Sequence, residues 1–303
     1  MNAAPALLGY VAGVGFLAPR LLLRSAWPHR APTLALAVWH GLTVSFTIAI
    51  ALAVHHLAMP TEHLHANVIG ALHYCGLATA TTVPDPAVVN RLVIALPISV
   101  LLLVFACFVF EAFRGRRARS RHRKILDMVG RRSPQLCATV LDHDVPAAYC
   151  LPGYKPRVVV SAGAVRLLSP GELEAVLEHE RSHITGRHHL ALAATQAFAR
   201  IFRRLPLAHH AKEQTSVLLE MIADDRALRR QSREELATAL YAMAAAKAAP
   251  AGAFAVNGPS AVARMRRVLI PQRRPHVALR GTVAATAAVV PVLPLMFACV
   301  PIG

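Results

Sequence analysis

The sequence predicts a membrane protein in two parts, four transmembrane helices and an α+β domain with a small antiparallel sheet. Three observations support this fold class. The 303 residues are 55% hydrophobic and only 16% charged, with a positive mean hydropathy, which is too apolar for an ordinary soluble domain. Four stretches are long and apolar enough to cross a bilayer. A more polar stretch of about 165 residues separates the third from the fourth, which is enough for one domain with its own core.

The predicted spans set the domain boundaries. They cover residues 4–23, 33–57, 92–113 and 281–300. The first has the length of a signal peptide, but no basic segment precedes it and Arg24 and Arg30 follow it, so we expect the protein to retain it. The chain then divides into a membrane region at 1–113 with an external loop at 58–91, a domain at 114–280, and a last span within 281–303.

Basic residues set the expected orientation. Arginines cluster after the first and third spans and before the fourth, whereas residues 55–90 contain neither lysine nor arginine. Because basic loops stay in the cytoplasm, we expect both termini outside and the domain at 114–280 inside. The net charge of +17 also suggests nucleic acid as a partner. Since the basic residues lie beside apolar stretches, we expect the lipid bilayer instead and no direct contact with nucleic acid.

The external loop is rich in potential metal ligands, and two interpretations stay open for it. The residues are His55, His56, Glu62, His63, His65, His73 and Cys75. They could form a metal-sensing site. The favoured alternative is a set of weakly polar side chains at the membrane interface, because only His63 and His65 show a ligand-like spacing. The five cysteines are odd in number and form no C-x-x-C pair, so neither a disulfide framework nor a zinc knuckle is expected.

Within the domain, strand-like segments precede helices. Residues 135–141, 147–151 and 157–161 are separated by turn formers and predict the antiparallel sheet. Ser169, Pro170 and Glu172 form a capping box that starts a helix. Residues 189–207 are apolar enough for a fifth span, but arginines interrupt them, so we expect an amphipathic helix on the inner leaflet or, equally, a core helix. A basic amphipathic segment follows near 262–270.

The first chemical motif is His179-Glu180-Arg181-Ser182-His183, an H-E-x-x-H sequence in a helical context. Residues four apart lie on one helix face, so His179 and His183 can bind one metal ion together. Glu180, one residue along, can then act on a water molecule as a general base. This is the geometry of a zinc peptidase. The alternative is a solvated helix face with two unrelated histidines.

A second helical segment supplies the remaining candidates. Glu220 and Asp224 lie four residues apart in it. A catalytic zinc ion needs three protein ligands, and Glu220 would complete a His₂Glu set. Asp224 could accept a hydrogen bond from a ligand imidazole. The alternative is a pair of ordinary surface acids near Arg226 and Arg229. For a second oxyanion donor the sequence offers only Arg226 and His188, each of which could equally be structural.

The order of these motifs resembles the membrane zinc peptidases of the M48/M56 type. The resemblance covers essentially all the chain, and the motifs that carry it are residues 148–153, 158–161, 168–173, the H-E-x-x-H motif and Glu220-x-x-x-Asp224. The topology is similar to the M56 branch, the antirepressors related to the β-lactam sensor-transducers BlaR and MecR. The resemblance implies a gluzincin-like domain with one Zn²⁺ held by His179, His183 and Glu220, and with Glu180 as the base.

One feature departs from the β-lactam sensors of that branch. These proteins carry a penicillin-binding domain after the last span, whereas only Pro301, Ile302 and Gly303 follow it here. No S-x-x-K motif outside the membrane offers a nucleophilic serine. We therefore expect no direct acylation of this chain by β-lactams.

The resulting hypothesis is a membrane-embedded zinc metalloendopeptidase with a cytoplasmic active site. By resemblance, its protein substrate is a cytosolic transcriptional repressor, for example of the winged-helix type, cleaved in response to an envelope signal. Two alternatives stay open: a housekeeping protease of membrane-protein quality control, and a non-catalytic transducer with structural zinc. The strand at Ala148, Tyr149 and Cys150 could bind an extended substrate at the edge of the sheet, or be a plain core strand. The sequence indicates nothing about the oligomeric state.

Overall fold

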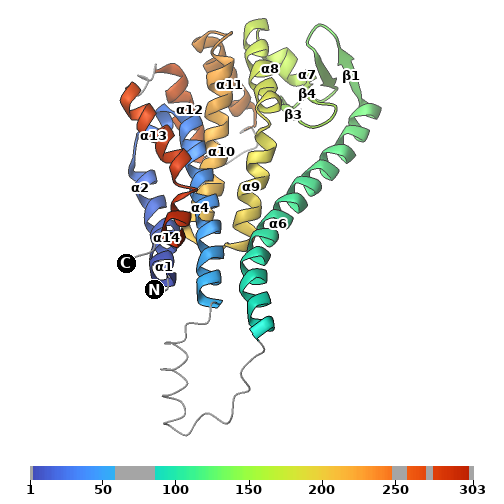
Figure 1. Cartoon of the computed structure of the whole chain (residues 1–303). Coiled ribbons are helices and arrows are strands. Elements are labelled where there is room, and N and C mark those ends of the chain that lie inside the picture. The colour runs from blue at the N-terminus through green and yellow to red at the C-terminus, as the bar shows by residue number, and fades with distance from the viewer. Residues whose placement is uncertain (1–2, 59–85, 248–257, 271–275, 300–303) are drawn as a thin grey trace.

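The computed structural model describes residues 3–58, 86–247, 258–270 and 276–299, which form a mostly helical molecule with one small sheet (Figure 1). The predicted external loop lies almost wholly outside the described residues, as do most of its histidines. His55 and His56 fall within the last turn of a helix.

Apolar helices dominate the first part of the chain. A continuous helical run comprises α1 (Ala4–Ala12), the π-helical η1 (Gly13–Leu17) and α2 (Ala18–Arg24), and α3 (Trp27–Arg30) and α4 (Pro32–Ala58) follow it. Within the described residues, three helical segments are long and apolar enough to cross a membrane: Ala4–Arg24, Pro32–Ala58 and Arg91–Val129. These helices suggest that the protein associates with a membrane.

The predicted fourth span corresponds to two shorter helices. These are α13 (Val277–Val289) and α14 (Leu293–Cys299), and both pack against α4. Pro291 and Pro294 explain the interruption, because proline removes a backbone donor and clashes with the preceding turn. The count of four spans therefore stays a prediction.

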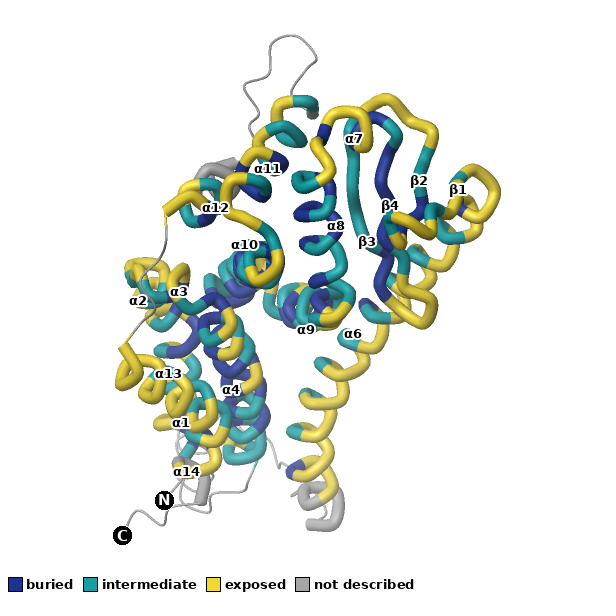
Figure 2. Tube along the Cα trace, turned by 90° about the horizontal axis from the view of Figure 1, so that it is seen from above, coloured by how far each residue is buried: buried dark blue, intermediate teal, exposed yellow. Residues whose placement is uncertain are grey.

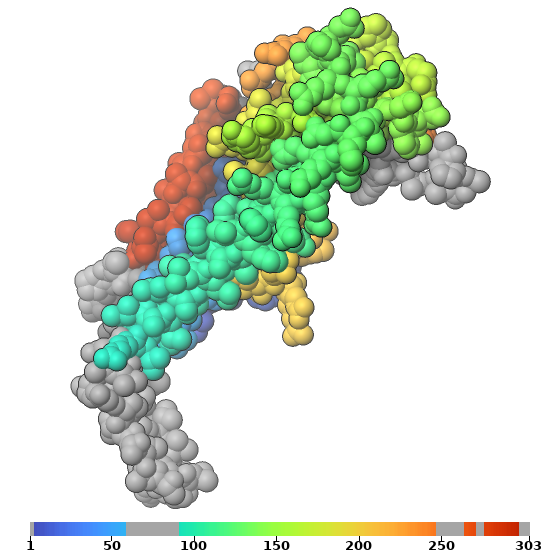
Figure 3. Space-filling view, turned by 90° about the vertical axis from the view of Figure 1, so that its right-hand side faces the viewer, coloured from blue at the N-terminus to red at the C-terminus, as the bar shows by residue number. Residues whose placement is uncertain are grey.

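The longest helix, α6, joins the apolar part to the sheet. It runs unbroken from Pro86 to Val129 and includes both apolar residues and the basic residues that follow them. The predicted domain boundary at 113/114 falls inside this helix, so the division into domains also stays a prediction. Much of α6 lies on the outer face of the molecule, where side chains such as Phe105 and Phe113 are exposed (Figure 3).

The sheet has four strands and is mixed. The strands are β1 (Gly130–Ser133), β2 (Ala138–Leu141), β3 (Ala148–Leu151) and β4 (Arg157–Ser161), in the order β1-β2-β4-β3. The pairs β1–β2 and β3–β4 are antiparallel, but β2 and β4 are parallel. The purely antiparallel prediction is therefore wrong. The chain places β4 between β2 and β3, and a strand pattern in the sequence contains no information on that order.

The helix with the H-E-x-x-H motif lies beside the sheet. The short α7 (Ala162–Leu167) precedes it, and α8 (Pro170–Thr185) begins at the predicted capping box of Ser169 and Glu172. Helix α8 lies between the sheet on one side and α10 (Pro206–Ala227) and α11 (Arg233–Lys247) on the other (Figure 2). Leu173 and Leu177 pack with Val158 and Val160 of β4 in one buried cluster.

A helical hairpin connects the sheet region to the apolar helices. Its arms are α9 (His188–Ile201) and α10, which lie beside α4 (Figure 1). Phe46 of α4 makes edge-to-face contacts with Phe198 and Phe202, with ring centroids 5.8 and 5.2 Å apart. The segment at 189–207, expected to be an amphipathic helix or a core helix, thus forms one arm of this hairpin and the turn that follows it. Finally, α12 (Gly258–Leu269) packs against α10 and α11.

Candidate metal centre

Helices α8 and α10 bring the three predicted ligands together. Nε2 of His179 and Nε2 of His183 are 3.2 Å apart, as the i, i+4 spacing on one helix face allows. Each of these nitrogens lies 3.5 Å from a carboxylate oxygen of Glu220. All three ligand atoms lie within 4.8 Å of one another. The site is therefore built from one turn of α8 and one side chain of α10.

The other ring nitrogens of both histidines face polar partners. Nδ1 of His179 is 3.0 Å from Oδ1 of the buried Asp224, although its N–H does not point along the line of a well-formed hydrogen bond. Nδ1 of His183 is 2.8 Å from Nδ1 of His188. Partners of this kind fix the ring orientation of metal-ligating histidines. They leave both Nε2 atoms facing Glu220.

His188 reaches this position because the chain reverses after α8. Arg187 has a φ of 50°, in the left-handed region, and α9 begins at the next residue. This reversal places the buried His188 behind His183. The sequence offered His188 only as an oxyanion donor, so its contact with His183 was missed. Arg226, the other such candidate, donates to the Ser182 carbonyl oxygen near the end of α8.

A residue that sequence reasoning missed completes the site. Arg264 of α12 donates from Nε and Nη2 to the two carboxylate oxygens of Asp224, at 2.9 and 2.8 Å. Its Nη1 lies 2.8 Å from Oε2 of Glu220. Two-point binding of this kind is the strongest form of arginine–carboxylate contact. The only signal in the sequence was the basic amphipathic pattern of α12, which did not indicate a partner.

The charges of the site are strongly coupled. Burial alone would raise the pKa of Glu220, but His179 and Arg264 outweigh it and lower that pKa to about 2. Burial opposes protonation of His179, yet Asp224 and Glu220 raise the pKa of its ring to about 9. Burial lowers the pKa of His183 to about 4. A proton on His179 and the guanidinium group of Arg264 therefore balance the charges of the buried Asp224 and the half-buried Glu220.

The predicted base and the predicted substrate strand lie together. Glu180 follows His179 on α8 and is half-buried. The thiol of Cys150 on β3 hydrogen-bonds to it, and burial followed by the charge of Glu180 raises the pKa of that thiol to about 12. β3 pairs with β4 alone, so it is an edge strand of the sheet, and it packs against α8. Ala148, Tyr149 and Cys150 all belong to this edge strand.

The donor set fits a zinc ion. Tetrahedral zinc with bonds of about 2.0–2.2 Å places neighbouring ligand atoms roughly 3.3–3.6 Å apart. The 3.2 Å between the two Nε2 atoms and the 3.5 Å from Nε2 of His183 to Oε1 of Glu220 are close to this spacing, whereas Nε2 of His179 lies 3.5 Å from the other oxygen of Glu220, Oε2. Within the part of the chain that the structure describes, one other group could hold a metal, His209, His210 and Glu213. Its three side chains lie on the single helix α10, and two of them are exposed.

Two histidines of one helix and a carboxylate of another, beside a sheet edge, are the arrangement of a metallopeptidase. A family model described as Peptidase family M48 matches residues 114–222, from within α6 to the C-terminal part of α10, and so includes the H-E-x-x-H motif and Glu220. This match supports an M48-like metallopeptidase, a peptide-bond hydrolase. No curated protein and no solved structure matches the chain.

Proposed function

We propose that this chain is a membrane-embedded zinc metalloendopeptidase. In this proposal His179, His183 and Glu220 hold one zinc ion, Glu180 is the catalytic base, and Asp224 orients His179. The convergence of the three ligand atoms within 4.8 Å is the observation that carries the proposal. The match of residues 114–222 to Peptidase family M48 supports the reaction class.

The chemistry divides between the metal and Glu180. When bound, zinc supplies a Lewis acid that lowers the pKa of water to about 7 and stabilises negative charge on the attacked carbonyl oxygen. Glu180 accepts the proton of the attacking water and delivers it to the leaving amine. Because Glu180 follows His179 by one residue on the helix, its carboxylate would lie beside the ligands without joining them. Arg264 keeps Glu220 anionic and therefore suited to bind a cation.

The edge strand β3 gives the substrate a place to bind. An extended peptide can pair with an exposed sheet edge through main-chain hydrogen bonds, which requires no particular substrate sequence. The contact between Cys150 and Glu180 places this edge next to the proposed base. A peptide paired with Ala148, Tyr149 and Cys150 would thus present a scissile carbonyl to the metal centre. We propose this edge as the substrate site.

The remaining features of the proposal come from the membrane helices and from the family resemblance. The three long apolar helices support a membrane protein, and the distribution of arginines supports a cytoplasmic active site with both termini outside. The resemblance to the M56 branch supports a cytosolic repressor as substrate and an envelope signal as trigger. We propose regulated proteolysis of this kind.

The decisive experiment uses the full chain in detergent or nanodiscs. Zinc content and cleavage of a protein-derived peptide library, read by mass spectrometry, are compared for the wild type, Glu180→Gln and His183→Ala. We expect Glu180→Gln to keep zinc and lose cleavage, and His183→Ala to lose both. The control is Glu174→Gln, which changes a half-buried acid on the same helix that pairs with Arg181, and it should cleave normally. Normal cleavage by Glu180→Gln would refute the proposal.

A further inference from the structure

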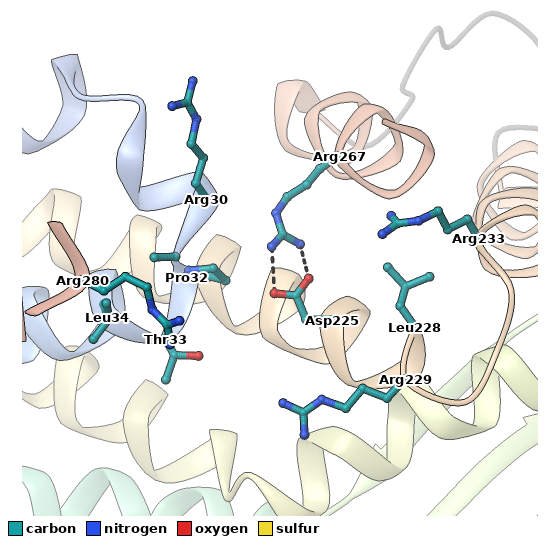
Figure 4. A pocket seen from close by; sticks show the side chains of 11 residues that line it. Arg30, Pro32, Thr33, Leu34, Asp225, Leu228, Arg229, Arg233, Arg267 and Arg280 are labelled. Carbon is teal, nitrogen blue, oxygen red and sulfur yellow. Dashed lines mark hydrogen bonds and ion pairs between the residues drawn. The ribbon is translucent and has the colours of Figure 1, made fainter. Parts of the chain in front are cut away.

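A basic cavity of about 450 Å³ lies apart from the metal centre, where α4, α10, α12 and α13 meet (Figure 4). Its lining combines the start of α4 with charged side chains from several other helices. Five of these are arginines, Arg30, Arg229, Arg233, Arg267 and Arg280, and one is an acid, Asp225. The cavity therefore holds an excess of four positive charges.

The single acid does not neutralise the cavity. Asp225 binds Arg267 through both of its oxygens, each at 2.7 Å, so its charge is already matched. Arg30, Arg229, Arg233 and Arg280 have no carboxylate partner among the residues that the structure describes. Guanidinium groups gathered around one space repel each other unless an anion lies between them. Planar guanidinium groups also match the geometry of phosphate oxygens.

The start of α4 adds further donors to the same cavity. Residues 31–34 line it, and α4 is 27 residues long. The first backbone N–H groups of a helix have no partner inside the helix, and the helix dipole makes this end positive. Ala31, which precedes the helix, has no side-chain oxygen that could accept from them. The N–H groups of Thr33 and Leu34 are therefore suited to bind an anion.

The surroundings of the cavity indicate a lipid. Arg30 lies between the apolar Ala4–Arg24 segment and α4, and Arg280 lies in the first turns of the apolar helix α13. Val277 and Leu279, next to Arg280, expose 78% and 43% of their surfaces. Such side chains favour hydrocarbon over water. Basic pockets between membrane helices at the cytoplasmic surface bind lipid headgroups for these reasons.

We propose that this cavity binds the phosphate-bearing headgroup of an anionic phospholipid. Arg229, Arg280 and the first turn of α4 hold the phosphate, and the neighbouring apolar side chains contact the acyl chains. Arg30 and Arg233 add positive charge around the phosphate, although Arg233 also donates to the carbonyl oxygen of Val268. Arg267 lies three residues after Arg264 on α12, so the helix that lines this cavity also reaches Glu220 and Asp224. A bound headgroup would hold α12 in place. The binding itself does not depend on the proposed peptidase activity.

The test measures lipid binding to the full chain in a neutral detergent by native mass spectrometry. Phosphatidylglycerol and phosphatidylcholine of equal chain length are titrated separately, and a third titration uses sn-glycerol 3-phosphate. The cavity variant is Arg229→Gln with Arg280→Gln. The charge-matched control is Arg203→Gln with Arg266→Gln, which removes two exposed arginines that do not line the cavity.

We expect the wild type and the control to prefer phosphatidylglycerol about tenfold over phosphatidylcholine, and the cavity variant to lose that preference. An equal loss in the control would mean that net charge alone attracts the lipid, which overturns the proposal. A preference retained in the cavity variant also overturns it. Glycerol phosphate that binds as tightly as the lipid, with the same dependence on the arginines, would assign the cavity to a soluble phosphate instead. An unchanged thermal unfolding temperature in the absence of lipid shows that the variants fold. If the double variant does not fold, Arg229→Gln alone takes its place.

Discussion

The guanidinium group of Arg264 lies 2.8 Å from Oε2 of Glu220, so the carboxylate proposed as the third zinc ligand already has a cation on one oxygen. The same guanidinium binds both oxygens of Asp224, which in turn faces His179. A single side chain of α12 therefore orients one ligand directly and a second through Asp224. The other oxygen of Glu220 faces His183 and stays available for the metal.

The first prediction concerns this arginine. Arg264→Gln should lower zinc affinity about 10- to 100-fold, because Glu220 and Asp224 lose the group that fixes their orientation. Arg264→Lys should restore little of it, since an ammonium group cannot bind two oxygens of Asp224 and reach Glu220 together. Competition with a chromogenic chelator measures the affinity. Arg266→Gln, two residues away and exposed, is the control. Equal affinities for Arg264→Gln and the control would show that α12 has no part in the metal site.

The second prediction separates Asp224 from its neighbour. Asp224→Asn should also lower zinc affinity about 10- to 100-fold, because an amide supports the Nδ1–H of His179 more weakly than a carboxylate does. Asp225→Asn should leave zinc affinity unchanged, since Asp225 points to Arg267 and the basic cavity. The same chelator assay compares the two. If both variants bind zinc as the wild type does, the contact between Asp224 and His179 has no role in metal binding.

Local signals in the sequence predicted the parts of the site that lie within single helices. The capping box at Ser169 fixed the start of α8, and the spacing of His179 and His183 placed both on one face. The placement of Glu220 and Asp224 on one face of a second helix likewise followed from their spacing of four residues. That these two helices approach each other was inferred from chemistry, because a catalytic zinc ion needs a third ligand.

Contacts made by distant segments could not be predicted in this way. Arg264 reaches Asp224 across 40 residues of sequence, and only the packing of α12 against α10 places it there. The parallel pairing of β2 with β4 similarly depends on the path of the chain between them. The strand β1 was missed because the polar sequence Gly130–Ser133 has no apolar alternation, and its pairing with β2 decides its conformation.

The third prediction uses cysteine reactivity to test the contact between β3 and α8. Burial and the charge of Glu180 raise the pKa of Cys150 to about 12, from an ordinary value near 9. A higher pKa means less thiolate below that pH, so at pH 8 Cys150 should react about a thousandfold more slowly than a free thiol. The exposed Cys137 should react readily. Iodoacetamide labelling followed by peptide mass spectrometry reads the two residues separately.

Two outcomes decide the origin of this protection. Glu180→Gln should increase labelling of Cys150, because it removes a negative charge from beside the thiol. It should leave labelling of Cys137 unchanged. Similar labelling rates for Cys150 and Cys137 in the wild type would contradict the contact between the edge strand and the proposed base, and with it the substrate site on β3.

The fourth prediction concerns the core that joins the apolar helices to the metal centre. Phe46 is 2% exposed and packs edge-to-face against Phe198 and Phe202 of the helical hairpin. Removing a buried phenyl ring leaves a cavity and typically costs about 3–5 kcal/mol. Phe46→Ala should therefore lower the thermal unfolding temperature of the detergent-solubilised protein by several degrees. Phe105→Ala removes the same ring from a site that is 62% exposed on α6 and should change that temperature little.

The same substitution tests whether this core supports the metal site. Glu220 lies on α10, the second arm of the hairpin, and Leu218 and Met221 of that helix belong to the same buried cluster as Phe46. A hairpin that packs loosely on α4 would hold Glu220 less firmly opposite the two histidines. At temperatures at which the variant is still folded, Phe46→Ala should thus bind zinc more weakly than the wild type. Phe105→Ala should bind zinc as the wild type does. If Phe46→Ala lowers the unfolding temperature but leaves zinc affinity unchanged, α8 and α10 align without support from the apolar helices.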